Sequence, residues 1–269
     1  MLPQSDLEIH IDNLNDTLGD LLGEFPTILS DHERVDEWFL SVCQCYRRRG
    51  IAALLLECQV DVFHQNLFKS GSACLAYVQL LHENSALEPY HLSTGRITPL
   101  FDAIVACDPL GAKEIARLTP HTFSKGNEYE DDFCYFYFLM QLGFLESSQE
   151  ALSRTLSRFE EVISQDSTNR FHLCKALLSK DGDGFYEAMD EFLLSRKARI
   201  EKYRENESED PIYLDTEGNI SIEGLALVRL AEMREMTTEE EYMFIPSLAR
   251  RPRAEGKYPS RNTWRNVDI

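Results

Sequence analysis

The sequence lacks the features of a membrane-spanning or secreted protein. No apolar run reaches the roughly 18 residues that a membrane-spanning helix needs, and the first residues, MLPQSDLEIHIDNLND, carry acids where a signal peptide is basic. The seven cysteines are an odd number, and without a secretory signal we expect them to be reduced thiols. We therefore expect a cytoplasmic protein with no membrane partner.

Motifs for common catalytic and metal sites are also missing. There is no His-Glu-x-x-His pair, no Gly-x-Ser-x-Gly turn and no glycine-rich phosphate loop. Cys43 and Cys45 point in different directions on a helix, and no second Cys or His pair has zinc-ligand spacing. The calcium-like start at Asp181 has Phe185 and Phe192 where oxygen ligands are required. We expect no metal, no cofactor and no enzymatic activity.

Basic residues are scarce relative to acidic ones. Lys and Arg number 27 against 46 Asp and Glu, which gives a net charge of −19. Such a chain is repelled by the phosphates of nucleic acid and is attracted to a basic protein. Acidity also keeps proteins soluble, so the charge by itself does not identify a basic protein partner. It argues more strongly against a nucleic-acid partner.

The first hundred residues have the apolar period of helices. A helix is predicted over residues 6–22, ended around Gly23 and Pro26, and a capping box of Ser30 and Glu33 opens the next one.

That second helix is predicted to end at Gly50, after Arg47, Arg48 and Arg49, because cations and then glycine are typical of a helix C-terminus. An apolar helix follows over 51–68. Beyond it, either two helices meet at Gly71 or one helix kinks there.

Further helical segments follow, joined by short polar turns. The aromatic segment is expected to be core, because a helix that is apolar on most sides is buried, and Ser147 with Glu150 is expected to cap the next helix. An alternative to helix is a short β-hairpin near residues 212–222. The predicted helices are 72–82, 99–107, 109–118, the aromatic segment 128–145, 147–163, 171–178 and 185–203.

These elements predict an all-α fold. Antiparallel helical hairpins would pack as a bundle or as an irregular solenoid-like array, without a fixed 34-residue repeat. We expect one helical domain over residues 1–250, with a candidate division near 83–97. Residues 251–269 have no periodicity and are predicted to be a basic, extended C-terminal tail that can dock on the acidic body.

Residues 219–250 are the stretch around which the rest is expected to pack. A core helix is predicted first, because its apolar residues leave no majority face for water. Thr237 with Glu240, and Thr238 with Glu241, fit capping boxes for a second helix, which Pro246 ends. The apolar residues of the first helix are Leu225, Leu227, Val228, Leu230 and Ala231.

The same stretch carries a family resemblance. ISIEGLALVRLAE, from Ile220, followed by EYMFIPSL, ending at Leu248, resembles the C-terminal signature of the immunity protein 49 family. FDAIVACDPLGAKEIA, within Leu100 to Ala116, is more loosely similar to the middle of that family. These bacterial proteins accompany polymorphic toxin and contact-dependent secretion systems. The resemblance implies an all-helical fold and neutralisation of a cognate toxin by binding, and it implies no catalytic residues.

Two acidic clusters are the candidate partner-binding residues. Each lies at a predicted helix start, where the helix dipole favours acids, so capping alone explains either cluster. Together with the net charge, they could face a cationic toxin and speed its association. The clusters are Glu128, Glu130, Asp131 and Asp132, and Glu239, Glu240 and Glu241.

The sequence thus predicts an immunity protein that occludes a cationic toxin acting in the cytosol, such as a nuclease. The alternative is a non-enzymatic helical scaffold or adaptor that binds a peptide or protein in a groove lined by Tyr and Asn.

Overall fold

The computed structural model describes residues 4–29, 31, 34–83, 93–164, 167–253 and 258–266. Its described residues form helices and no strand, so the all-α prediction is confirmed. The predicted Ser30–Glu33 cap and most of the 83–97 connector lie outside the described residues. The elements are α1 (Gln4–Ile28), α2 (Val35–Glu57), α3 (Val60–Glu83), η1 (Thr94–Arg96), α4 (Pro99–Val105), α5 (Pro109–Leu118), α6 (Glu130–Gly143), α7 (Gln149–Val162), α8 (Thr168–Ser179), α9 (Gly182–Asn206), α10 (Pro211–Asp215), α11 (Ile222–Met233), α12 (Ser247–Arg250) and η2 (Arg261–Arg265).

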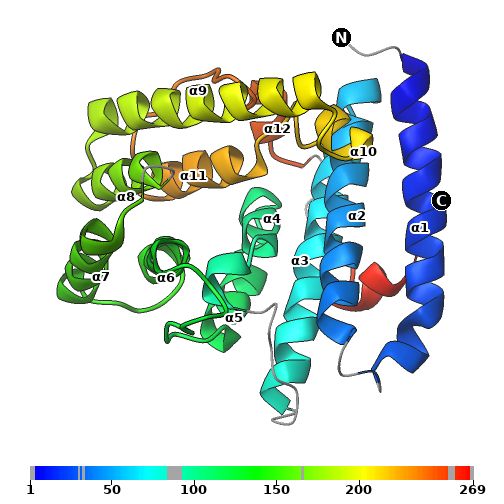
Figure 1. Ribbon diagram of the computed structural model, residues 1–269, viewed down its shortest axis with the longest axis horizontal. Coiled ribbons are helices and arrows are strands. Elements are labelled where there is room, and N and C mark those ends of the chain that lie inside the picture. Colours follow the sequence, from blue (N-terminus) through cyan, green and yellow to red (C-terminus); the bar gives the residue numbers. More distant parts are fainter. Residues whose placement is uncertain are drawn as a thin grey trace.

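The helices form two groups with α4 and α5 between them (Figure 1). On one side α1, α2 and α3 stand side by side and antiparallel. On the other side α9 runs transverse to the upright helices, with α8 and α11 side by side beneath it and α6 and α7 further below. Figure 1 also shows α10, directly after α9, against the upper part of α2. Antiparallel hairpins packed as a bundle are therefore what the chain forms.

Helix α1 continues through Gly23 and Pro26, where the sequence predicted its end. Tertiary contacts hold this last stretch in place. The indole N–H of Trp38 donates to the Leu21 carbonyl at 3.0 Å, and Phe25 packs against the Trp38 ring with 5.6 Å between ring centroids. These contacts offset the local preference against helix at Gly23 and Pro26.

Helix α2 likewise passes through Gly50, so the predicted end there is wrong. Glycine at this position serves helix packing: a Cβ on Gly50 would lie 3.0 Å from the Asn66 Cβ in α3. Gly71 serves the same purpose, since its Cβ would lie 3.0 Å from that of Ala103 in α4. One continuous α3 passes through Gly71, and the break in the apolar run falls at Cys58, which has a left-handed backbone with φ of 54°.

The predicted core helices are confirmed as core. Both α6 and α11 bury most of their side chains, and Phe136 of α6 packs against Phe101 of α4 at 5.0 Å between ring centroids. The two helices thereby join the two groups through α4. The buried aromatic residues of α6 are Phe133, Tyr135, Phe136 and Phe138, and those predicted for α11 are Leu225, Leu227, Val228, Leu230 and Ala231.

Two local predictions in the C-terminal half are wrong. Residues 211–215 form helix α10 in place of a hairpin strand, because Pro211 is a favourable first helical residue and the Asp210 side chain accepts from the Ile212 N–H. Helix α7 is capped by Ser148, whose hydroxyl accepts from the Ala151 N–H, and not by Ser147.

The second helix predicted after Thr237 is also absent. Residues 236–246 form a turn with an isolated bridge between Tyr242 and Ile245. The Glu241 carboxylate accepts from the Ser247 N–H at 3.0 Å, so it reaches forward to α12 instead of back to a threonine. A partner further along the same segment thus replaces the reciprocal cap.

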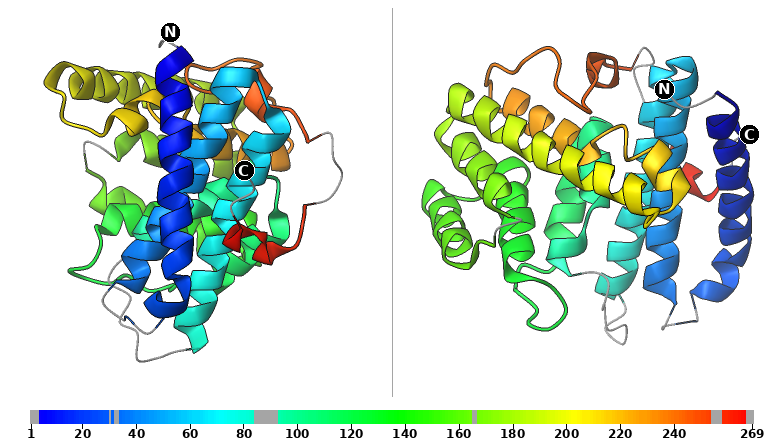
Figure 2. Two further views of the ribbon diagram at one scale, coloured as in Figure 1. Left: turned by 90° about the vertical axis from the view of Figure 1, so that its right-hand side faces the viewer. Right: turned by 45° about the horizontal axis from the view of Figure 1, so that its top comes forward.

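The C-terminal segment 258–266 docks on the helices around α3 (Figure 2). Trp264 is 1% exposed and lies edge-on to Phe25. Tyr258 stacks on Phe68 with ring centroids 4.2 Å apart, and Arg261 pairs with Asp108 at 2.7 Å. Aromatic burial and one ion pair hold this segment, beyond the general attraction between a basic tail and an acidic body.

A buried ion network ties the two helix groups together. In α2, Arg47 donates from Nε and Nη2 to Asp102 of α4 at 2.8 and 2.9 Å, and Ser70 of α3 donates to the same carboxylate at 2.6 Å. Arg47 also reaches Glu217 at 3.3 Å, and Arg48 reaches Glu217 at 3.0 Å. Arg47 and Arg48, which were predicted to end a helix, are thus cross-links between distant segments.

Replacing Asp102 tests this network. Asp102→Asn leaves Arg47 buried with one charged partner fewer, and removing one member of a buried pair costs about 3 to 5 kcal/mol. We expect that loss in the free energy of unfolding measured by urea titration. Glu150→Gln removes the exposed pair with Arg154 and should cost less than about 0.5 kcal/mol. Equal losses in the two variants would contradict the assignment.

Candidate functional site

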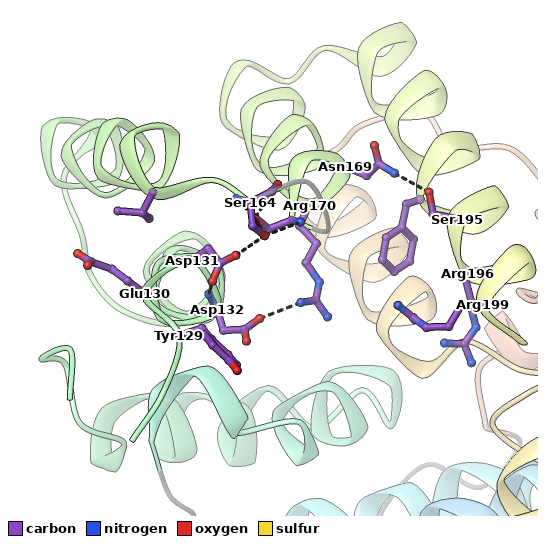
Figure 3. Close-up of a pocket in the computed structure, with 13 residues that line it drawn as sticks. Tyr129, Glu130, Asp131, Asp132, Ser164, Asn169, Arg170, Ser195, Arg196 and Arg199 are labelled. Carbon is purple, nitrogen blue, oxygen red and sulfur yellow. Dashed lines mark hydrogen bonds and ion pairs between the residues drawn. The ribbon is translucent and has the colours of Figure 1, made fainter. Parts of the chain in front are cut away.

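A cleft of about 640 Å³ opens between the start of α6, the end of α7, the start of α8, and α9 (Figure 3). One wall carries acidic side chains from α6 and the other carries basic ones from α9. The lining residues are Tyr129, Glu130, Asp131, Asp132, Val162, Ser164, Ser167, Asn169, Arg170, Phe192, Ser195, Arg196 and Arg199.

Three of the predicted acidic residues lie on this cleft, and each has a partner. Glu130 pairs with Arg158 at 2.6 Å, and Asp131 accepts from the Ser164 hydroxyl at 2.7 Å. Asp132 pairs with Arg170 at 3.0 Å, although burial still raises the pKa of Asp132 above its ordinary value. The acidic wall is therefore partly neutralised and held in a defined shape.

Glu128, the fourth member of this cluster, is turned into the protein. Its side chain is buried and accepts from the N–H groups of Gly95 at 2.6 Å and Ser124 at 2.9 Å. The carboxylate thereby fixes the loop before α6 to η1. Glu128 is a connector of two loops and does not line the cleft.

The second predicted cluster lies elsewhere. Glu239, Glu240 and Glu241 are exposed in the turn before α12, and none of them lines the cleft. Arg250 donates to the backbone carbonyls of Glu239 and Glu240. The structure therefore does not bring the two predicted clusters together in the cleft.

The basic wall was missed by sequence reasoning. Arg170 of α8 donates two hydrogen bonds to Glu223, at 2.8 and 3.0 Å. Arg196 and Arg199 extend from α9 (Figure 3). Arg196 and Arg199 are three residues apart, a spacing that places them on one helix face. That spacing was the only signal in the sequence. Arg170 lies on a different helix, and only the folded chain brings it to the same cleft.

A second, polar pocket of about 300 Å³ adjoins the cleft and shares Asp132, Arg170 and Arg196 with it. Its other charged residues include Arg47 and Glu217 of the buried network. The cleft is thus continuous with the ionic contacts that join the two helix groups. Charge recognition is the chemistry that this arrangement supports.

An apolar hollow of about 520 Å³ lies between α4, α5 and α11. Ile104, Ala112 and Phe144 contribute to its walls, and Met233, which is 54% exposed, stands on it. Leu110, next to the lining residue Pro109, is 72% exposed. This surface has the apolar character of an interface centre, whereas the cleft has the polar character of a rim.

Among the described residues, no group of three or more His, Cys, Asp or Glu side chains is arranged to hold a metal ion. Of the helices that are described, none combines the length and the apolar character that crossing a membrane requires.

The sequence model of the immunity protein 49 family matches residues 7–249, from the first turn of α1 into α12. The segment 258–266 with its buried Trp264 lies beyond the match. No curated protein and no solved structure matches the chain.

Glu217, beside the cleft, gives the free energy of unfolding a defined pH dependence. Burial alone would raise the pKa of Glu217, but Arg47 and Arg48 outweigh it, so the folded-state pKa lies below the ordinary 4.5. Such a group contributes stability above about pH 4.5 and loses it as the pH falls through the folded-state value. Glu217→Gln should therefore destabilise at pH 7, by about 1 to 3 kcal/mol, and the difference from wild type should shrink below pH 4.5.

Urea titrations from pH 7 to pH 3 measure this difference. Glu187→Gln, an exposed change on α9, is the control and should track the wild type at every pH. A Glu217→Gln deficit that stays constant down to pH 3 would rule out the charge as its cause.

Proposed function

The chain belongs to the immunity protein 49 family, and from this premise we propose that it binds a cognate bacterial toxin and neutralises it. The carrying observation is the extent of the match, which spans residues 7–249 and thus the whole helical body. Family membership implies protection by binding, and the described residues bring no metal-binding cluster together.

The proposed toxin is cationic and acts in the cytosol, as a nuclease does. A net charge of −19 speeds the approach of a basic protein. Enzymes that act on nucleic acid need basic substrate-binding surfaces, and acids placed opposite those residues would occlude them. Glu130, Asp131 and Asp132 at the cleft, and Glu239 and Glu240 on the turn before α12, are the proposed acidic contacts.

A peptide-binding scaffold is the second candidate. It is favoured by the concave shape of the cleft and by Tyr129, which is 75% exposed, and Asn169 among its lining residues. Exposed tyrosines and amides are typical of grooves that bind extended peptides.

A rescue experiment separates the two candidates. The C-terminal domain encoded by the adjacent upstream reading frame is expressed in a sensitive cell, with and without this protein. We expect death without it, survival with it, and co-purification of the two proteins. A harmless neighbour, or killing that is equal in both cases, would reject the immunity function and leave the scaffold.

The acidic contacts make a separate prediction. Glu130→Gln with Asp131→Asn removes two negative charges from the cleft and should slow association with the toxin several-fold at low salt, with a smaller effect at high salt. Stopped-flow association rates measure this. Asp190→Asn with Glu191→Gln removes the same charge from exposed positions of α9 outside the cleft. Equal slowing in both double variants would mean that only the net charge matters.

A further inference from the structure

Arg196 is a buried cation that forms no ion pair with any carboxylate among the described residues. It is 8% exposed, and its Nη2 donates to the backbone carbonyl of Glu217. Its Nε is buried and has no hydrogen-bond partner within the part of the chain that the structure describes. In the same region Arg47 and Arg170 each pair with two carboxylates.

Leaving a guanidinium in this state is costly. A buried charge is tolerated when it is paired and fully hydrogen-bonded, and an unpaired one costs several kcal/mol. Burial lowers the pKa of Arg196, and the nearby charge of Arg199 lowers it further, while Tyr213, Glu223 and Glu217 oppose this only in part. Within the described residues of so acidic a chain, no carboxylate forms an ion pair with this side chain.

The unpaired group faces the cleft. Arg196 and Arg199 both line it, opposite the acidic wall formed by Glu130 and Asp131 (Figure 3). Arg199 is exposed, so the pair forms one accessible and one deep guanidinium on the same face of α9. Phe192 of α9 also lines the cleft and adds an apolar surface to its basic wall.

We propose that this basic end of the cleft binds a carboxylate side chain of the partner protein, which pairs with Arg199 at the mouth and Arg196 within. The inference rests on the proposed function in taking that partner to be the toxin. A guanidinium presents parallel N–H donors that match the two oxygens of a carboxylate. Partly buried arginines of this kind are among the residues that contribute most to interfaces.

The opposite wall explains why a carboxylate is preferred to a phosphate. Glu130, Asp131 and Asp132 would repel a dianion more strongly than a single carboxylate, because electrostatic repulsion grows with the charge. The same acids attract a basic residue of the partner. The cleft therefore recognises an acidic and a basic group side by side, which determines the orientation of the partner in a way that net charge alone cannot.

Arg199→Glu tests the proposal, with Lys202→Glu as the matched control. Both substitutions change an exposed base of α9 to an acid, but Lys202 does not line the cleft. We expect Arg199→Glu to weaken toxin binding at least about 10-fold and Lys202→Glu less than about 2-fold, by calorimetric titration. Arg196→Met, checked for a wild-type melting profile, should weaken binding at least as much as Arg199→Glu.

A second arm uses acetate, which carries a single carboxylate, as a probe on this protein alone, at constant ionic strength. Acetate should raise the melting temperature of wild type and of Lys202→Glu by the same amount, and that of Arg199→Glu by clearly less.

The two arms separate the failures. If wild type binds the toxin and the Arg199→Glu and Lys202→Glu affinities are equal, the carboxylate site is overturned while the immunity function stands. If the toxin does not bind wild type, the proposed function fails and acetate decides: equal shifts in all three proteins overturn the site, and a shift lost only in Arg199→Glu supports it.

Discussion

The pairing of buried charges is the constraint on which the rest of this structure depends. Asp102 has no exposed surface on its side chain, so α4 can lie between the two helix groups only where Arg47 meets it. Glu217, far along the chain, completes the network. Because a buried charge without its partner costs several kcal/mol, this network admits one relative placement of α2, α4 and the segment before α11. Apolar packing alone would tolerate more alternatives.

The cleft follows from the same constraint. Arg170 joins Glu223 at the start of α11 to Asp132 at the start of α6, and this cross-link holds the acidic wall in position. Within the part of the chain that the structure describes, no carboxylate pairs with Arg196, which lies where the network meets the cleft. The paired charges hold their side chains in place, and Arg196 is left to pair with a charged group of a partner. Such an arrangement is suited to recognition, because little ordering of side chains is needed on binding.

Particular residues show which members of the cleft could be identified from the sequence and which could not. The acids at 130–132 were found because they cluster at a helix start, and they do line the cleft. Glu128 belongs to the same cluster, yet it turns inward to Gly95, a contact between segments 33 residues apart. Arg196 and Arg199 gave no signal beyond helical spacing, because an arginine on a mostly polar helix is normally exposed.

The sequence by itself determined the helical class, the core character of α6 and α11, and the family signature, because apolar periodicity and composition are local properties that survive any arrangement of the helices. Tertiary structure decided that α1 continues through Pro26 and α2 through Gly50, that Glu241 accepts from the Ser247 N–H ahead of it, and which arginines become cross-links. Each of those outcomes depends on contacts that the local sequence pattern does not identify, and together such contacts outweigh local preferences worth about 1 to 3 kcal/mol.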